Sequence, residues 1–458
     1  MEIRDWRLET PINRQSPKVT KNMDKERLLS WMLPKRHKPP KPIPPGLYPY
    51  LHDENGAITR FHLRVEPDGQ GMLLANAAAA ARLNPTGVVM VKQLLDGDPP
   101  DAVLNDVLSR YKGASRETVA ADLQQVRSLL SSLTSPDDNY PIINFNEIKV
   151  NIFESQMLAP LEASVPLAEP EKIVPILDKL WHVGIPHVTF LAPEQADAVQ
   201  MIRAVERAED LGLIAGVRGR ATDLHQDGLL ANLAQAGVDH VTVLYAAANA
   251  EVHDALCGAG DHALLADLYA AIETNEVCPV AEIPLVESTL DILRETLTRL
   301  LDAGVHNFSF FAIVAPQGMG NEERAGALTA QAMPQTAAWV EEIAHQADVR
   351  FIWQPPVQRD PRLTLAEQVC QGPRCSGDAA VRIETNGDVI PPRGPYLKAG
   401  NLLADPWPMI WGNRAFVRYR ERVAAPTRCM DCPGLVICEA DCPREQSGWA
   451  QGVGGALA

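Results

Sequence analysis

Between residues 146 and 356, short apolar runs alternate with amphipathic segments at a spacing typical of strand–helix units. Because the runs are almost continuously apolar, they suit parallel strands that helices cover. The pattern predicts strands at residues 146–153, 187–192, 212–217, 240–246, 277–285, 306–315 and 349–355. These are too few for a closed eight-stranded barrel. The predicted fold class is therefore α/β, with a partial (β/α)6 TIM-like barrel over residues 140–358.

An internal repeat supports the strand–helix interpretation. The segments GIPHVTF, GVDHVTV and GVHNFSF begin at Gly184, Gly237 and Gly304, and each glycine is placed to end a helix before an apolar strand. Four histidines lie at or near the N-terminal ends of these strands: His182, His187, His240 and His306. Active sites of barrels gather at the opposite, C-terminal ends of the strands, so structural roles are expected for these histidines.

A separate compact unit is predicted at residues 48–135. The segment FHLRVEPDGQGMLL (residues 61–74) alternates like two strands around a turn, and LNPTGVVMVKQLLDG (residues 83–97) resembles a capped helix that glycine ends. A later helix carries an apolar stripe of Leu123, Val126, Leu130 and Leu133. Together these elements predict a winged-helix-like domain, with either an architectural role or a role in peptide recognition.

Charge is distributed unevenly along the chain. The formal net charge is −16, yet the first 50 residues carry 11 Lys or Arg against 5 Asp or Glu. The acidic remainder repels phosphate backbones, which argues against nucleic acid as a partner. The basic residues 1–47 include KRHKPPKPIPP (residues 35–45), whose prolines favour an extended chain. This segment is either a solvated linker or an arm that docks on an acidic partner.

Cysteine usage and hydropathy indicate a cytoplasmic protein without a membrane span. The chain has 8 cysteines in 458 residues, far below the density of a disulfide scaffold, and no secretory h-region is recognisable. It also lacks a run of about 18 apolar residues that could cross a bilayer.

Four cysteines are concentrated in CMDCPGLVICEADC (residues 429–442). Thiolates are preferred ligands of soft metals, and two cysteines close in sequence can bind one ion from a single turn. Cys429, Cys432, Cys438 and Cys442 are therefore predicted metal ligands, for iron–sulfur or for Zn²⁺; the alternative is a set of reduced thiols. Cys257 and Cys278 stand alone and are expected to be buried thiols.

The barrel pattern, the stretch HDALCGAGDHALLADLYAAI (residues 253–272) and the cysteine tail resemble radical S-adenosylmethionine enzymes with a C-terminal SPASM domain. The segments IETNGDVIPP (residues 383–392) and GNLL (residues 400–403) resemble the hairpin before the SPASM clusters. The motifs LNPTG and LLDG resemble those of the domain with which ribosomal-peptide maturases hold a leader peptide. In that family the leader peptide adds a strand to the edge of the domain's sheet. The resemblance implies a peptide-recognition domain at 48–135 and a SPASM-like metal domain at 365–458.

The sequence departs from this family where the cofactor would bind. The family's C-x-x-x-C-x-x-C motif occurs nowhere in the chain, and the aligned positions are Ser155, Ala159 and Glu162, none of which is a thiolate. Of the family's Gly-Gly-Glu-Pro turn, which approaches the cofactor, only Glu194 is kept. S-adenosylmethionine is therefore not expected as a cofactor, nor is its reductive cleavage.

The resemblance also divides six cysteines into two sets of auxiliary-cluster ligands: Cys370, Cys375 and Cys442 in one, and Cys429, Cys432 and Cys438 in the other. Each set lacks a fourth thiolate, and Pro392 stands at the missing position of the first set. A carboxylate such as Asp388 or Asp441, water or a partner protein would complete the open iron. Alternatively, the four tail cysteines close around one Zn²⁺ or one cluster.

Two function classes follow from the resemblance and its departures. In the first, the chain is a pseudoenzyme that binds a peptide substrate or a catalytic partner protein and serves as an iron–sulfur-carrying accessory subunit. In the second, it is an enzyme with non-radical chemistry at the barrel mouth or at an open auxiliary iron site. The lost cofactor motif favours the first class, with residues 1–133 as the expected contact surface.

Overall fold

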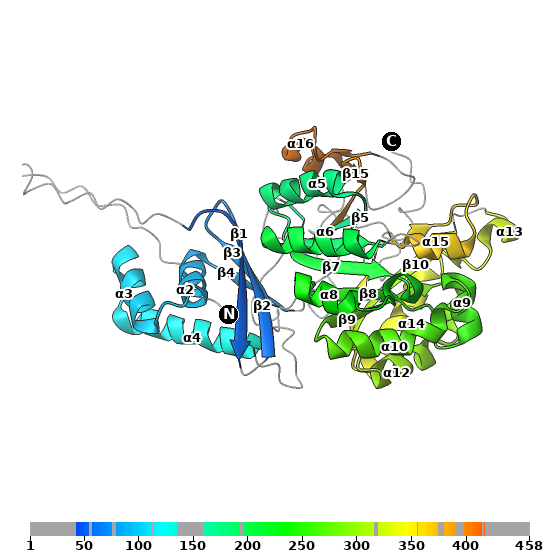
Figure 1. Cartoon of the computed structure of the whole chain (residues 1–458), viewed down its shortest axis with the longest axis horizontal. Helices are drawn as coiled ribbons and strands as arrows, with labels where there is room; N and C mark the ends of the chain where they lie inside the picture. The colour runs from blue at the N-terminus through cyan, green and yellow to red at the C-terminus, as the bar shows by residue number, and fades with distance from the viewer. Residues whose placement is uncertain are drawn as a thin grey trace, which may run out of the picture.

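Figure 1 shows a computed structural model of the chain, which describes residues 43–54, 57–75, 79–111, 113–134, 159–160, 162–192, 197–315, 319–354, 356–373, 380–390, 398–414 and 416. An antiparallel sheet with its own helices forms an N-terminal unit, and a larger α/β unit follows it. Within the described ranges, none of the helices combines the length and apolarity needed to cross a bilayer.

The N-terminal unit contains a four-stranded antiparallel sheet in the order β1-β2-β3-β4. Its strands are β1 (Gly46–Glu54), β2 (Ala57–Val65), β3 (Gly71–Ala75) and β4 (Ala79–Leu83). The predicted hairpin at residues 61–74 is confirmed as β2 and β3, which pair in antiparallel register. Alternation places Phe61, Leu63 and Val65 on one face of β2, where they join the buried core of this unit.

Helices α2 (Pro85–Leu95), α3 (Pro100–Arg110) and α4 (Arg116–Thr134) cover one face of this sheet (Figure 1). The predicted helix at residues 83–97 is confirmed as α2: the Asn84 side chain accepts a hydrogen bond from the Gly87 N–H at 2.8 Å, which caps the helix start. The other face of the sheet is turned toward the larger unit. The winged-helix assignment of this unit stays a prediction.

The larger unit is built on consecutive parallel strands, so the predicted α/β class is confirmed. The strands are β5 (Glu162–Pro166), β6 (His187–Leu191), β7 (Ile214–Gly219), β8 (His240–Leu244), β9 (Cys278–Leu285), β10 (Asn307–Ala315) and β12 (Arg350–Trp353), with short β11 (Leu328–Thr329) and β13 (Val357–Gln358) beside β10. All except β5 and the two short strands match predicted positions. Closure of this sheet into a partial barrel stays a prediction.

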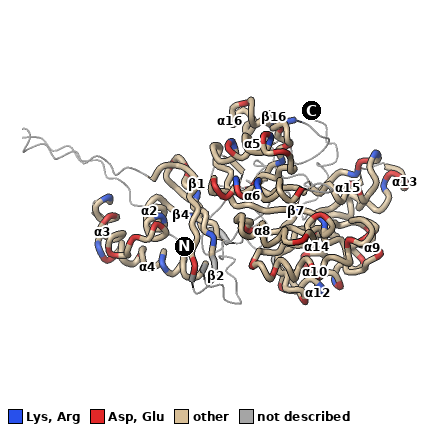
Figure 2. Tube along the Cα trace, viewed as in Figure 1, with Lys and Arg blue, Asp and Glu red and all other residues tan. Residues whose placement is uncertain are grey.

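Helices lie between the strands, and most of them contribute apolar side chains to one large core. They are α5 (Pro170–Val183), α6 (Ala198–Asp210), α7 (Ala221–Leu224), α8 (Leu229–Ala236), α9 (Ala250–Cys257), α10 (Asp261–Thr274), α11 (Glu287–Leu290), α12 (Leu293–Asp302), α13 (Asn321–Arg324) and α14 (Met333–Gln346). The repeated glycines end helices as predicted: Gly184 and Gly237 cap α5 and α8 in the left-handed conformation. Figure 2 shows acidic residues on α9, α12 and α13.

The C-terminal region extends the parallel sheet. Its elements are α15 (Leu365–Gln371), β14 (Ala380–Ile383), β15 (Asp388–Ile390), β16 (Gly400–Asn401) and α16 (Trp407–Trp411). Strand β14 pairs in parallel with β5 and in antiparallel with β15, so the hairpin predicted from IETNGDVIPP is confirmed. The turn uses Gly387 at a φ of +87°, a conformation that favours glycine.

Candidate functional site on the polar face of the parallel sheet

Two faces of the parallel sheet differ sharply in chemistry. Side chains such as Val188, Phe190 and Val217 join the core beneath the helices, whereas their neighbours along the same strands are polar. The polar, largely buried side chains are Ser164, Thr189, Arg218, His240, Glu282 and Ser309, and Glu162 lies in line with them. Buried polar groups require partners or ligands, so this polar face is the candidate functional site.

A buried ion pair dominates the C-terminal half of the polar face. The Arg218 guanidinium of β7 donates from Nε and Nη2 to Glu282 Oε2 of β9, at 2.8 and 2.5 Å. Its Nη1 also donates to the Cys370 carbonyl at the end of α15, at 3.1 Å. A Cβ at Gly372 would lie 2.5 Å from Arg218 Nη2, so this glycine leaves room for the guanidinium. Arg218 therefore links two strands to the C-terminal region.

Two histidines and a carboxyl group lie toward the N-terminal ends of the strands. The rings of His187 and His240 meet edge to face, with centroids 4.8 Å apart. Loss of hydration lowers the pKa of both imidazoles to about 4, so both are neutral at pH 7. Burial also raises the pKa of Glu162, which accepts a hydrogen bond from the Thr189 hydroxyl at 2.8 Å.

Gly216 of β7 makes room for the His240 ring. A Cβ at this position would lie 2.0 Å from Cε1 and 2.1 Å from Nε2 of His240. We expect Gly216→Ala to lower the free energy of unfolding by about 1–3 kcal/mol or more, because the ring or the strand must move. Chemical denaturation followed by circular dichroism measures this loss.

The matched control is the same substitution in a His240→Ala background. Without the ring, Gly216→Ala should cost only a few tenths of a kcal/mol, because no side chain occupies the space of the new methyl group. Equal losses in the two backgrounds would contradict the steric explanation.

The structure corrects the predicted position of the cluster loop. Glu162, expected in a loop after the first strand, is itself the first residue of β5, and Ala159 just before it is fully buried. Strand β5 was missed because EASVP is short, contains a proline and mixes polar with small apolar residues. The strand expected at residues 146–153 lies outside the described residues, as do Ser155 and Glu194.

Among the predicted metal ligands, the structure describes only Cys370. Its thiol lies against α9 and donates to the Leu256 carbonyl at 3.4 Å, and burial raises the pKa of this thiol. The other predicted cysteine ligands, which are Cys375, Cys429, Cys432, Cys438 and Cys442, lie outside the described residues. Their division into sets therefore stays a prediction. Asp388, suggested as a further ligand, is held by Lys398 and Asn401.

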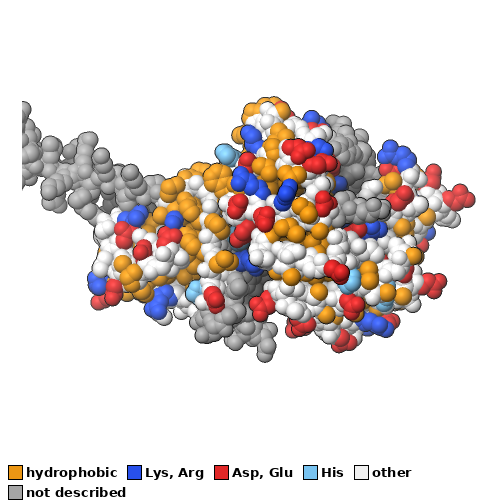
Figure 3. Space-filling view, viewed as in Figure 1, with side chains coloured by type: hydrophobic (Ala, Val, Ile, Leu, Met, Phe, Trp, Pro, Cys, Tyr) orange, Lys and Arg blue, Asp and Glu red, His pale blue; other side chains and the backbone are white. Residues whose placement is uncertain are grey.

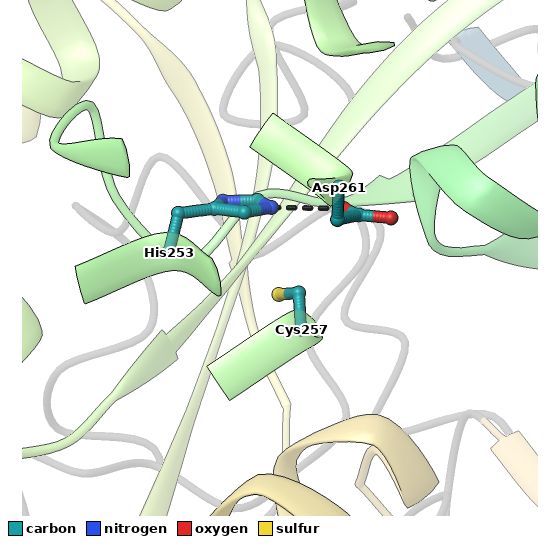
Figure 4. Close-up of side chains that lie close together, drawn as sticks. All are labelled: His253, Cys257 and Asp261. Carbon is teal, nitrogen blue, oxygen red and sulfur yellow. Dashed lines mark hydrogen bonds and ion pairs between the residues drawn. The ribbon is translucent and has the colours of Figure 1, made fainter. Parts of the chain in front are cut away.

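Sequence reasoning missed a cluster of His253, Cys257 and Asp261 at the junction of α9 and α10 (Figure 4). His253 Nδ1 accepts the Ala246 N–H at 3.2 Å, so Nε2 carries the proton and donates to Asp261 at 2.9 Å. Asp261 also accepts two hydrogen bonds from Thr222. Both ring nitrogens are occupied, which indicates a structural pair.

Cys257 is buried, as expected for a lone thiol, and burial raises its pKa well above the ordinary value. It is therefore protonated at neutral pH and a poor nucleophile. The four-residue spacing of His253 and Cys257 places these two side chains on one face of α9, which a helical pattern could have indicated in advance. Asp261 begins α10 after two glycines, so its approach depends on the turn between the helices and has no local signal. Cys278, also expected to be buried, is only partly so.

No protein-family model and no curated protein matches the chain. Similar solved structures include Streptococcus suis SuiB bound to S-adenosylmethionine, with 14% identity, a TM-score of 0.46, and coverage of 83% of this chain and 94% of that one. SuiB bound to precursor peptide SuiA has 12% identity and a TM-score of 0.45, with coverage of 86% of this chain and 95% of that one. The structure of anSMEcpe with bound AdoMet and Kp18Cys peptide has 12% identity and a TM-score of 0.42, with coverage of 61% of this chain and 88% of that one. Similarities this weak do not show the function of this chain.

Proposed function

We propose that this chain is a catalytically degenerate relative of the radical S-adenosylmethionine enzymes with SPASM domains. In this proposal it binds a peptide or a partner protein, carries iron–sulfur or another metal at its C-terminal cysteines, and acts as an accessory subunit in peptide maturation. The N-terminal sheet provides the binding surface, and the parallel sheet provides the scaffold.

The connection between β5 and α5 carries the proposal. The chain leaves β5 at Pro166 and begins α5 at Pro170, so the connection consists of Leu167, Ala168 and Glu169. The Leu167 N–H donates to the Leu191 carbonyl at 3.0 Å, which continues the pairing with β6 beyond the strand end. By the family resemblance, the cluster loop follows the first strand of the barrel, and β5 is the first parallel strand among the described residues.

A connection this short does not fit such a cluster loop. It contains no thiolate, and three residues, the first of them hydrogen-bonded to β6, are too few to supply the three spaced ligands of a four-iron cluster. The residues present therefore do not fit S-adenosylmethionine bound through a cluster at this position, and no chemical step is assigned to that cofactor.

Charge pairing on the polar face supports the same conclusion. The Arg218 guanidinium is engaged by Glu282 and by the Cys370 carbonyl. Both side chains are buried, with 8% and 4% of their surfaces exposed. Two buried charges that pair with each other hold the scaffold together, but neither charge is then available to bind a charged ligand. A binding role on another surface of the molecule is therefore favoured.

The N-terminal sheet offers such a surface at β1. This strand is at one end of the sheet order, and an edge strand has backbone groups that can pair with an added strand. Leu51 on β1 is 67% exposed, although it is a large apolar residue. Figure 3 shows hydrophobic side chains gathered over this part of the N-terminal unit. Both features suit an extended peptide with an apolar side chain.

The proposed function predicts that Leu51→Arg reduces recovery of the bound peptide or protein at least tenfold. The arginine removes an apolar contact and places a charge at the proposed binding edge. Affinity-tagged full-length chain is purified from a lysate of the cells that naturally produce it, and the bound material is quantified by mass spectrometry.

The matched control is Val199→Arg, because Val199 on α6 is also apolar and 53% exposed but belongs to the parallel-sheet unit. Recovery with this control should equal that of the wild-type chain. If Leu51→Arg and Val199→Arg recover the same material in the same amounts, β1 is not the binding edge.

A further inference from the structure

The polar face of β2 is buried between the two units of the molecule. Arg60, His62 and Arg64 alternate with the apolar residues that face the N-terminal core, so they lie on the opposite face of the strand. There, Arg60 donates to the Ala234 carbonyl at 3.4 Å, and His62 Nδ1 bonds to the Gly212 carbonyl at 3.2 Å. His62 is only 1% exposed.

His62 meets two carboxylates of the larger unit. Asp239 immediately precedes β8, and Glu209 lies near the end of α6. One ring nitrogen of His62 and one oxygen of each carboxylate lie within 4.8 Å of one another. Asp239 is 4% exposed. A Cβ at Gly237, one of the repeated glycines, would lie 2.8 Å from Glu209 Cγ, so this glycine leaves space for the Glu209 side chain.

The atoms that converge in this cluster are buried and have no hydrogen-bond partner: His62 Nε2, Asp239 Oδ1 and Glu209 Oε2. The opposite atoms of the two most buried side chains are engaged. A carbonyl can only accept, so His62 Nδ1 carries the proton toward Gly212 in the neutral ring, and Nε2 presents a lone pair. Asp239 Oδ2 accepts the Ala215 N–H at 2.9 Å, which turns Oδ1 toward His62.

The spacing within the cluster suits a shared ion better than a direct hydrogen bond. His62 Nε2 and Asp239 Oδ1 are 3.6 Å apart, longer than the ~2.7–3.2 Å of a hydrogen bond. Two ligands at about 2.0–2.1 Å from one tetrahedral Zn²⁺ are separated by about 3.4 Å. The carboxylates of Glu209 and Asp239 both face the His62 ring, and Arg60 lies close enough for its charge to act on both of them.

We propose that His62, Glu209 and Asp239 bind one divalent transition-metal ion of the Zn²⁺ type, which fastens the N-terminal sheet to the parallel-sheet unit. The bond from His62 Nδ1 to a backbone carbonyl is the outer contact that orients a metal-binding histidine. His187 is close enough to Asp239 and His62 for their charges to act on it, and its Nε2 is also buried and unpaired. His187 or a water molecule supplies the fourth ligand.

The test is a titration of the full-length, chelator-treated chain with Zn²⁺ and with Co²⁺. Wild-type protein and His52→Ala, which removes an exposed histidine of the same sheet, should bind one equivalent more than His62→Ala or Glu209→Gln. All four proteins have the same cysteines, so metal bound by the cysteines contributes equally to each and does not affect the comparison. The extra Co²⁺ should show weak visible bands without a thiolate charge-transfer band.

Glu209→Gln keeps the size of a partly exposed side chain, so it separates loss of a ligand from failure to fold. Zn²⁺ should raise the melting temperature of the wild type and His52→Ala more than that of the two ligand variants. Equal stoichiometry and equal stabilisation in all four proteins would overturn the proposal and leave His62 and Asp239 as a plain ion pair.

Discussion

Replacing Arg218 with alanine is expected to lower the free energy of unfolding by about 3–5 kcal/mol. The substitution leaves the Glu282 carboxylate buried, with 4% of its side-chain surface exposed, and removes the partner that donates two hydrogen bonds to it. It also removes the donor to the Cys370 carbonyl, which links α15 to β7. Denaturant unfolding at pH 7, followed by far-ultraviolet circular dichroism, measures the change.

The control for this prediction is the double variant Arg218→Met, Glu282→Leu. It removes both charges and keeps similar volumes, so it should be much closer to the wild type than Arg218→Ala is. A single variant as stable as the wild type would show that the pair is not buried in the folded protein. A double variant as unstable as the single one would assign the loss to packing rather than to an unpaired carboxylate.

Replacing Cys429 and Cys432 together with alanine should remove a large part of the metal from anaerobically prepared protein. Their spacing places two thiolates where one ion can bind both, and a site that loses two of its ligands binds metal weakly. Elemental analysis for iron and zinc, with a sulfide assay, distinguishes iron–sulfur from Zn²⁺. Cys257→Ala is the control, because Cys257 is a buried thiol beside α10 and outside the tail.

Unchanged metal content in the double variant would place the metal elsewhere in the chain. The proposed site at His62 is one such place, and its ligands contain no sulfur. The sulfide assay and the thiolate charge-transfer band therefore separate the two sites within one preparation.

The parallel strands could be predicted because their signals are local. In β6 and β8, a glycine ends the preceding helix and an apolar run follows within a few residues. Strand β5 lacks this signal, since it is preceded by no such glycine and alternates Glu162, Ala163 and Ser164. Its place in the sheet is fixed by pairing with β6 and β14, which a local pattern does not contain.

The side-chain clusters could not be predicted for the same reason. His62 and Gly212 are 150 residues apart in sequence, and Arg218 and Glu282 are 64 apart. The alternation of β2 correctly separates His62 from Phe61, but a polar strand face is ordinarily expected to face solvent. Only the packing of one unit against the other buries that face.

The most direct test of the proposed function is an anaerobic assay of the purified, reduced chain with S-adenosylmethionine, scored by chromatography for 5′-deoxyadenosine. An active radical S-adenosylmethionine enzyme is assayed in parallel as the positive control. The three-residue connection from Pro166 to Pro170 predicts no product above the protein-free reaction. Formation of one equivalent or more of 5′-deoxyadenosine per chain would contradict the account, because it would require a cofactor-binding cluster that this connection does not fit.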